Sequence, residues 1–310
     1  MYRLFLSRIY LTYFIIFICT SPGKAPVKQL SDGYIIPALA LGTFGFDDIP
    51  KIRQAVNWAV EAGYRHIDTA ALYGNEEEVG KGLSDVIGKG LVEREEIFVT
   101  TKLWNDKHAR NQVVPALRES LKKLGLDYVD LYLIHSPEAT TADGSPLKID
   151  FLETWQGMEE AKRLGLARSI GVSNFNTTQI DRIIANSKLV PVINQVEVHP
   201  SKTQEDLIRD CHERGIHVMA YSPFGFFVSR DGPSKPGVND PKILNIAKKY
   251  GKLVTQVVLR YLVDRDLIPI PKSTNQKRLQ ENINVFDFQL TPEEVNIISS
   301  FNTNSSIFDD

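Results

Sequence analysis

Four polar residues of complementary chemistry follow short apolar runs that are typical of buried β-strands. A tyrosine with its ordinary pKa of about 10 is a weak acid at neutral pH, so it protonates a carbonyl oxygen usefully only where a cation stabilises the phenolate. An amine supplies that cation, a carboxylate keeps the amine charged, and an imidazole can donate a hydrogen bond to the same oxygen. The four residues are Asp68, Tyr73, Lys102 and His135.

Each of these residues also has an ordinary structural explanation. Asp68 could cap a loop, and Tyr73 could pack against a helix. Lys102 could lie along apolar surface, and His135 could satisfy backbone groups at the end of a strand. Their combination favours a site that polarises a carbonyl, although the residue types alone leave a metal-free hydrolase or isomerase open.

The elements that must position these residues are short strands alternating with helices. Such alternation predicts a parallel sheet, and eight strands predict a closed (β/α)8 barrel, in which the carboxyl ends of the strands carry the active site. An open doubly wound sheet is disfavoured because the segment after Leu41 lacks the glycine-rich turn that binds dinucleotides in that fold. The predicted strands are residues 38–41, 66–68, 98–101, 129–134, 167–172, 192–196, 217–221 and 268–270.

The predicted helices fill the intervals between the strands, and a small hairpin precedes them. Residues 27–30 and 34–36 flank Asp32 and Gly33, a strong hairpin signal. Helices are predicted at residues 51–62, 76–87, 111–124, 151–164, 178–186, 204–214, 241–250 and 277–285, and two extra helices at 256–263 and 291–301.

Residues 1–25 have the order of a secretory signal peptide. Arg3 and Arg8 flank an apolar stretch at residues 9–19, and small or turn-forming residues follow. That stretch is shorter than the roughly 20 residues that cross a bilayer, so no stable membrane span is expected. We therefore expect a barrel domain at residues 26–310 that is secreted or lies in the endoplasmic reticulum lumen. A cytoplasmic protein with a disordered extension or a misassigned start is the alternative.

Composition narrows the function classes. With 310 residues, 43% hydrophobic content and a formal net charge of −2, the chain is typical of a globular protein without the basic surface that nucleic acid requires. Cys211 would be the one cysteine left after removal of the leader, so no intrachain disulfide is expected. No metal site is predicted, and the absence of an apolar heptad pattern favours a monomer. Asn176 and Asn304 begin glycosylation sequons.

Six motifs resemble those of the aldo-keto reductases, over about residues 29–302. They are GYRHIDTA at 63–70, YGNE at 73–76, TKLW at 101–104, LIH at 133–135, GVSNF at 171–175 and IPKS at 270–273. The resemblance implies a (β/α)8 barrel with Tyr73 as the general acid. It also implies that Lys102 and Asp68 lower the pKa of Tyr73 and that His135 orients a small-molecule carbonyl substrate.

The same resemblance implies a nicotinamide dinucleotide cofactor, with NADPH favoured over NADH. Side chains after the fifth and sixth strands would bind the carboxamide, and an aromatic ring after the seventh would stack on the nicotinamide. Two cations and hydroxyls at a helix N-terminus would bind the 2′-phosphate. The predicted cofactor residues are Thr43, Asp68, Ser173, Asn174, Gln195, Tyr221, Ser222, Lys272, Ser273, Thr274, Arg278, Glu281 and Asn282.

Aromatic residues in the loops after strands predict an apolar substrate pocket beside His135, walled by Phe44, Trp104, Phe226 and Phe227. Many aldo-keto reductases carry an aromatic residue after the catalytic histidine, whereas Ser136 stands there and should open the pocket. The chain ends soon after its last predicted helix, so the lid over the substrate is expected to be missing or shortened, which would weaken the binding of bulky substrates.

Two runs, at residues 98–110 and 220–226, are especially similar to insect aldo-keto reductases that reduce 3-dehydroecdysone. This resemblance leaves two substrate classes open, 3-dehydroecdysteroids and ordinary aldehydes. A cofactor-binding regulatory barrel with negligible turnover, or a structural protein recruited from an enzyme, are the alternatives from other function classes.

Overall fold

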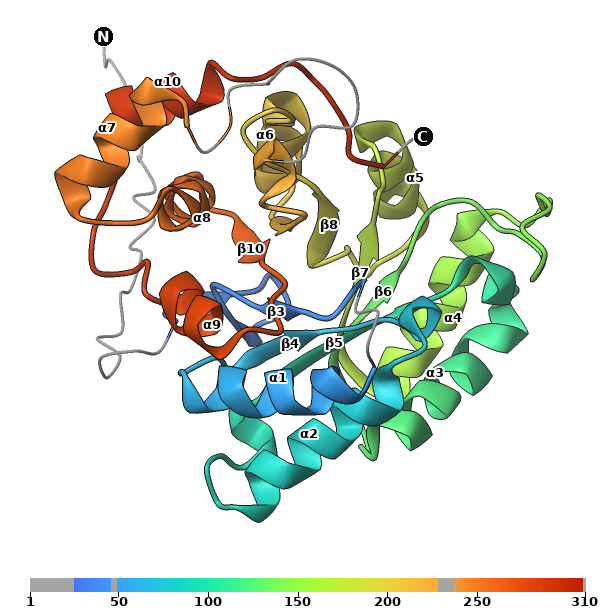
Figure 1. The fold of residues 1–310 in the computed structure, drawn as a ribbon. Helices are drawn as coiled ribbons and strands as arrows, with labels where there is room; N and C mark the ends of the chain where they lie inside the picture. The colour runs from blue at the N-terminus through green and yellow to red at the C-terminus, as the bar shows by residue number, and fades with distance from the viewer. Residues whose placement is uncertain (1–24, 46–48, 228–236, 238, 309–310) are drawn as a thin grey trace, which may run out of the picture.

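The structure is a computed structural model that describes residues 25–45, 49–227, 237 and 239–308. All but the last residue of the predicted leader lies outside this described part. Within it, the chain forms a barrel of parallel strands surrounded by helices (Figure 1). Among the described residues, no helix is both long enough and apolar enough to cross a membrane.

Eight parallel strands form the barrel, as the sequence predicts, and they pair in sequence order. The sheet closes where Ala40 N donates to Pro269 O at 3.1 Å and Gly42 N donates to Pro271 O at 3.0 Å. The strands are β3 (Leu41–Gly42), β4 (His66–Asp68), β5 (Phe98–Leu103), β6 (Val129–Ile134), β7 (Ala167–Ser173), β8 (Ile193–Glu197), β9 (His217–Tyr221) and β10 (Ile268–Ile270).

The first barrel strand is shorter than predicted and begins later. Ala38 N donates to Pro26 O at 2.8 Å, so the start of the predicted strand at 38–41 belongs to the ladder of the N-terminal hairpin. That hairpin consists of β1 (Val27–Gln29) and β2 (Ile35–Pro37), which pair antiparallel. The apolar run was recognised correctly, but its division between two sheets depends on which strands lie beside it.

The hairpin closes the lower, N-terminal end of the barrel. Leu30 and Ile36 from this region pack in one hydrophobic cluster with barrel residues such as Leu131, Ile193 and Met219. All five side chains are at most 2% exposed. The barrel interior is therefore a packed core that is sealed from below, and the upper end is where polar side chains can meet a ligand.

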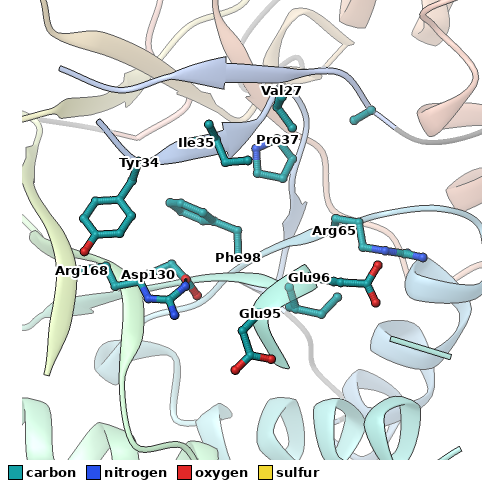
Figure 2. A pocket seen from close by; sticks show the side chains of 12 residues that line it. Val27, Tyr34, Ile35, Pro37, Arg65, Glu95, Glu96, Phe98, Asp130 and Arg168 are labelled. Atoms are coloured by element: carbon teal, nitrogen blue, oxygen red, sulfur yellow. Dashed lines mark hydrogen bonds and ion pairs between the residues drawn. The ribbon is translucent and has the colours of Figure 1, made fainter. Parts of the chain in front are cut away.

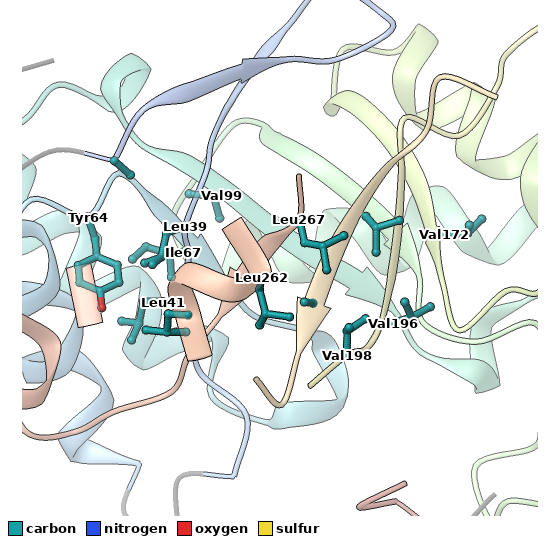
Figure 3. Packing of buried hydrophobic residues seen from close by; sticks show 14 of the residues in the cluster. Leu39, Leu41, Tyr64, Ile67, Val99, Val172, Val196, Val198, Leu262 and Leu267 are labelled. Carbon is teal, nitrogen blue, oxygen red and sulfur yellow. The ribbon is translucent and has the colours of Figure 1, made fainter. Parts of the chain in front are cut away.

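A second layer of apolar side chains joins the outside of the barrel to the helices, and Figure 3 shows part of it. Val99 on β5 and Val172 on β7 belong to this layer, together with Leu262 from a surrounding helix. The helices are α1 (Pro50–Glu61), α2 (Glu76–Gly88), α3 (Arg110–Leu124), α4 (Phe151–Arg163), α5 (Thr177–Asn186), α6 (Glu205–Glu213), α7 (Pro241–Tyr250), α8 (Val254–Asp264), α9 (Gln276–Ile283) and α10 (Pro292–Ser299).

The identity of one extra helix differs from the sequence prediction. Helix α8 contacts β10 and α9 and buries Val257, Leu259 and Leu262, so it is the barrel helix between the last two strands. Helix α7 instead contacts α8 and α10 and lies outside α8 (Figure 1). The two additional helices are thus α7 and α10. Both α7 and α8 have apolar faces, and their sequences alone do not say which face meets the sheet.

Candidate active site

Lys102 lies at the centre of a hydrogen-bonded group on the upper end of the barrel. Its side chain, on β5, has no exposed surface. Its Nζ donates to Asp68 Oδ1 at 2.6 Å, to the Thr69 carbonyl at 3.0 Å and to Tyr73 Oη at 3.1 Å. The amine, carboxylate and phenol predicted from the sequence are therefore in direct contact.

Asp68 is fixed from three sides. Its second carboxylate oxygen accepts from Gln195 Nε2 at 2.8 Å, so both oxygens have partners. The Asp68 carbonyl accepts from Thr43 Oγ1 at 3.0 Å and from Thr43 N at 3.1 Å. Thr43 is fully buried. The Thr43 hydroxyl thus positions the strand end that carries Asp68, and its predicted contact with the cofactor stays a prediction.

A short turn of 3-10 helix, η1 (Ala71–Tyr73), presents the phenol of Tyr73 to Lys102. Gly74 ends this turn with φ of 65°, a left-handed conformation that glycine adopts without a Cβ penalty. Asn75 then fastens the turn to its neighbours, because it accepts from Thr69 Oγ1 and donates to the Thr43 carbonyl. The loop that carries the proposed acid is thus tied to both β3 and β4.

Burial and charge act in opposite directions on the Tyr73–Lys102 pair. Burial raises the pKa of Tyr73 above its usual value; Lys102 acts against this, and Asp68 adds to it. Burial would lower the pKa of Lys102, but the attraction of Asp68 and Tyr73 outweighs it, so the pKa is raised. Asp68 therefore acts on Tyr73 through Lys102, which it keeps charged, and the phenol remains protonated.

His135 follows β6 and lies beside Tyr73. The two ring centroids are 5.8 Å apart, and the Trp104 ring lies 5.1 Å from the imidazole. Burial, with a further contribution from the charge of Lys102, lowers the pKa of His135 to about 3. The imidazole is therefore neutral at physiological pH and can donate one N–H without adding positive charge.

The residues predicted to bind the carboxamide form one network at the ends of β7, β8 and β9. Ser173 Oγ donates to the Gln195 carbonyl at 2.8 Å, and Asn174 Nδ2 donates to the His135 carbonyl at 2.9 Å. Tyr221 Oη donates to Asn174 Oδ1 at 3.0 Å, which fixes the orientation of the half-buried ring. Asn174 and Ser222 both have positive φ, at 63° and 50°, so the backbone turns sharply as it leaves these strands.

The predicted phosphate and adenine residues gather at α9. Lys272 and Arg278 are exposed there, while Ser273 is buried and its Oγ accepts from Asn275 N at 3.1 Å. Lys272 Nζ also donates to the Gly45 carbonyl at 3.1 Å, which links the α9 side of the barrel to the β3 loop. Of the remaining predicted residues, Thr274 and Glu281 are partly exposed and Asn282 is buried.

Two of the aromatic residues that were predicted to line the substrate pocket lie beside Tyr73 and His135. The Phe44 and Tyr73 ring centroids are 5.0 Å apart, and Trp104 lies against His135. Phe226 is 1% exposed and stacks on Phe301 at 5.2 Å in the main hydrophobic core. The prediction that Phe226 walls the substrate pocket is therefore wrong, because the side chain has no surface to offer a substrate.

A polar group that the sequence prediction missed lies next to His135. Asn105 Nδ2 donates to Ser136 Oγ at 3.1 Å, and Ser136 Oγ donates to Glu138 Oε2 at 2.6 Å. Asn105 Oδ1 is buried without a partner. Ser136 was recognised as a departure from the aromatic residue of relatives, but its partner Asn105 comes from a neighbouring loop and gave no local signal.

The C-terminal segment also reaches this end of the barrel. The Phe308 ring centroid lies 5.9 Å from Phe44 and 5.9 Å from Tyr221. A short covering segment is therefore present, so of the two expected outcomes, a missing or a shortened lid, the structure has the shortened one. The sequence alone showed where the helices end but not the direction in which the remaining residues turn.

A separate cavity of about 270 Å³ lies at the lower end of the barrel, away from the catalytic group (Figure 2). Tyr34 and Ile35 of the hairpin region, Arg65, Phe98 and Arg168 are among its lining residues. Arg168 pairs with Asp130 at 3.2 Å, so the polar part of the wall is partly neutralised. Within the described part of the chain, no cluster of three or more histidine, cysteine or acidic residues could hold a metal ion.

Comparison with known proteins gives consistent matches along nearly the whole barrel. The model of the aldo/keto reductase family matches residues 38–303. Aldo-keto reductase AKR2E4 of Bombyx mori is 62% identical over 92% of this chain and 95% of its own length. Dihydrodiol dehydrogenase 3 of Bos taurus is 42% identical over 91% of this chain and 93% of its own.

Solved structures agree with these sequence matches. The crystal structure of Bombyx mori AKR2E4 in complex with NADP has a TM-score of 0.90 over 92% of this chain and 95% of that one. The structure of aldo-keto reductase AKR2E5 complexed with NADPH is 42% identical, with a TM-score of 0.89 over 92% of this chain and 90% of that one.

Proposed function

This chain belongs to the aldo/keto reductase family, and we propose that it reduces aldehydes and ketones to alcohols with NADPH, with Tyr73 as the proton donor. The observation that carries the assignment of Tyr73 is its contact with a charged, fully buried lysine, at 3.1 Å between Lys102 Nζ and Tyr73 Oη. A phenol next to such a cation can release its proton to an alkoxide because the resulting phenolate is stabilised.

The other residues of the group prepare this proton transfer. Asp68 holds Lys102 in position and keeps it charged, as their separation of 2.6 Å indicates. His135, being neutral, donates a hydrogen bond to the substrate oxygen and so directs that oxygen towards Tyr73. When bound, NADPH supplies the hydride that reaches the carbonyl carbon.

The donor groups on this chain fit a nicotinamide dinucleotide phosphate. Lys272 and Arg278 are exposed cations close to the N-terminus of α9, where backbone N–H groups also favour an anion. We assign them, with Ser273 and Thr274, to the 2′-phosphate, and Glu281 and Asn282 to the adenine. At the other end, Ser173, Asn174 and Gln195 would hold the carboxamide, and the half-buried Tyr221 ring would stack on the nicotinamide.

The pocket favours a substrate that combines an apolar body with hydroxyl groups. Phe44 and Trp104 supply apolar surface beside Tyr73 and His135. Ser136 and Glu138 supply hydrogen-bonding groups next to it. A 3-dehydroecdysteroid has this combination, and we propose it as a substrate on the strength of the similarity at residues 98–110 and 220–226. Aldehydes without hydroxyl groups are the second class.

A comparison of kcat/KM values tests this substrate assignment. With 3-dehydroecdysone and an aromatic aldehyde as substrates, Glu138→Ala should lower kcat/KM for the steroid by about tenfold, the effect of one lost hydrogen bond to a charged group, and affect the aldehyde less. An equal effect on both substrates, or no steroid reduction by the unchanged protein, would remove ecdysteroids from the proposal.

Replacement of Tyr73 by phenylalanine tests the reaction itself. The Tyr73→Phe protein should lose at least about a hundredfold in kcat for NADPH oxidation with an aromatic aldehyde, because general acid catalysis contributes at least that much. NADPH binding, followed by quenching of protein fluorescence, should persist. Tyr128→Phe is the matched control, since its buried hydroxyl has no hydrogen-bond partner and lies at the base of β6. Equal rates for the two variants would exclude Tyr73 as the acid.

We further propose that the leader directs the enzyme into the secretory pathway and that the mature enzyme acts as a monomer. Both sequon asparagines are exposed, but Asn304 is the better acceptor because the side chain of Asn176 already has a structural role. Asn176 caps α5, where its side chain accepts from Gln179 N at 2.9 Å. N-terminal sequencing and glycosidase digestion of protein expressed in insect cells test this. A retained Met1 would place the enzyme in the cytoplasm, and light scattering would give its mass in solution.

A further inference from the structure

Glu197 is a buried carboxylate that belongs to none of the roles assigned above. It is the last residue of β8 and is 2% exposed. Because side chains alternate along a strand, Glu197 points to the same side as Gln195, two residues earlier, but lies closer to the catalytic end. Its backbone is in register with Tyr221 on β9, the residue assigned to the nicotinamide. The carboxylate is therefore one layer above the Gln195–Asp68 contact.

Four donors converge on this carboxylate from two segments of the chain. His199 Nε2 lies 2.9 Å from Oε1, and Lys202 Nζ lies 3.3 Å from Oε2. The other two donors come from the C-terminal segment: Ser306 Oγ bonds to Oε2, and Ile307 N donates to Oε1 at 2.8 Å. Burial raises the pKa of Glu197, but the hydrogen bonds from His199, Ser306 and Ile307 outweigh burial and bring it to about 2.

The C-terminal segment follows a defined path to this position. Thr303 N and Ser305 N both donate to the Ser201 carbonyl at 3.1 Å, which fastens the segment to the loop after β8. In Figure 1 the segment runs from α10 past α6 towards α5. Ile307 then meets Glu197, and Phe308 follows directly. The chain is thus held at two successive points before it reaches the aromatic residues of the site.

Phe308 closes the gap between the two sides of the site. Its ring makes edge contacts with Phe44, which lies beside the proposed acid, and with Tyr221. The position of Phe308 depends on its neighbour Ile307, whose amide is bonded to Glu197.

We propose that Glu197 is a positioning residue for substrate selection: by binding Ser306 and Ile307, it holds Phe308 between Phe44 and Tyr221 as a wall of the substrate pocket. This inference rests on the proposed reductase function. Glu197 does not touch the reacting atoms, and its effect passes through Phe308. Loss of the carboxylate charge should loosen the C-terminal segment and weaken contacts to large apolar substrates more than contacts to small ones.

Steady-state kinetics of three variants test the proposal. Glu197→Gln, Phe308→Ala and the double variant are compared using a large aromatic aldehyde and a three-carbon aldehyde with NADPH. In Glu197→Gln, the ratio of KM for the large aldehyde to KM for the small one should rise by about tenfold, with a smaller change in kcat. In the Phe308→Ala background, the Glu197→Gln change should have little further effect on that ratio, because the two residues act in series.

A matched control is Glu159→Gln, which removes the charge from a glutamate that also accepts a hydrogen bond from a serine, Ser187, but lies on the outer helix α4. It should leave the KM ratio unchanged. Equal effects of Glu197→Gln on both aldehydes, or independent and additive effects of Glu197→Gln and Phe308→Ala, would overturn the proposal.

A second readout does not depend on activity. The amide of Ile307 should exchange slowly with deuterated solvent in the full chain and at least about tenfold faster in Glu197→Gln, because the bond to the carboxylate is weakened. Unchanged exchange would overturn the proposed link. If none of the carbonyl compounds tested supports NADPH oxidation by the unchanged protein, the reductase proposal fails. The exchange measurement would still decide whether Glu197 holds the C-terminal segment.

Discussion

At the scale of single residues, the site depends on a charge with no exposed surface. Lys102 is completely buried, and a buried ammonium is tolerated only where its donors are satisfied. Asp68, Thr69 and Tyr73 accept from all three of its N–H groups. The lysine therefore cannot move without leaving a buried charge unpaired, which gives the phenol of Tyr73 a fixed neighbour.

The pKa directions at the site predict how activity depends on pH. The proposed mechanism requires neutral His135 and protonated Tyr73. Because the pKa of His135 is lowered to about 3 and that of Tyr73 is raised, neither group titrates between pH 5.5 and pH 8. We expect kcat/KM for an aldehyde to vary by less than about threefold over this range at constant ionic strength. A fall in kcat/KM centred at about pH 6.5, the ordinary pKa of histidine, would contradict this expectation if the fall were absent from the His135→Gln variant.

The grouping of the proposed reactive residues could be predicted from the sequence, but their electrostatics could not. Residue types at successive strand ends were sufficient to group Asp68, Tyr73, Lys102 and His135. The sign of the shift at Tyr73 depends on how deeply the ring is buried relative to Lys102, which is a property of the packing. Phe226 was misassigned for a similar reason, since its ring is covered by Phe301, which is distant in the sequence.

At the scale of elements, the N-terminus of α9 links stability to the proposed binding of the cofactor phosphate. Asn275 caps this helix by accepting from Arg278 N at 3.0 Å. Asn275→Ala should lower the free energy of unfolding by about 1 kcal/mol and raise the Kd for NADPH, because the cap orders the turn that carries Arg278. Urea denaturation and fluorescence titration measure the two effects.

Asn275→Asp separates these two effects. Aspartate caps helices about as well as asparagine, so stability should return to its original value. Its negative charge next to Lys272 and Arg278 should still weaken binding of NADPH, and much less so that of NADH, which lacks the 2′-phosphate. Equal weakening for the two cofactors would show that the phosphate does not bind at this turn.

The alternation of strands and helices was sufficient to predict the barrel. The pattern alone did not show whether α7 or α8 is the helix that packs against the barrel strands. Both helices are amphipathic, and α8 follows α7 after a short turn at residues 251–253. Burial of Leu259 and Leu262 between α9 and the last strand decides the question. Likewise, the hairpin signal at Asp32 and Gly33 predicted a turn, but not that the hairpin would close the barrel.

At the scale of the whole molecule, buried histidines make stability depend on pH. Burial lowers the pKa of His66 to about 3 and that of His108 to about 4. In the unfolded chain both would bind protons below about pH 6.5, while the folded chain does not. Stability is therefore complete above that pH and falls as the pH is lowered towards 4, by about 1.4 kcal/mol per pH unit for each histidine.

Replacement of His108 tests this dependence. Neither of its ring nitrogens has a hydrogen-bond partner, so His108→Leu removes a titrating group without breaking a bond of the ring. The fall in unfolding free energy between pH 6 and pH 5, measured in urea, should become smaller by about 1 kcal/mol in this variant. An unchanged slope would mean that His108 does not remain neutral in the folded protein.

The two ends of the described chain lie at opposite ends of the barrel, and this has a practical consequence for protein engineering. Ala25 lines the cavity beneath the hairpin, whereas Phe308 contacts Phe44 and Tyr221 at the catalytic end. A purification tag or fluorescent fusion attached before Ala25 would emerge far from the substrate. The same fusion attached at the carboxyl end would begin beside the pocket mouth and compete with the contacts of Ile307, so an apparently inactive recombinant enzyme could result from the position of the tag alone.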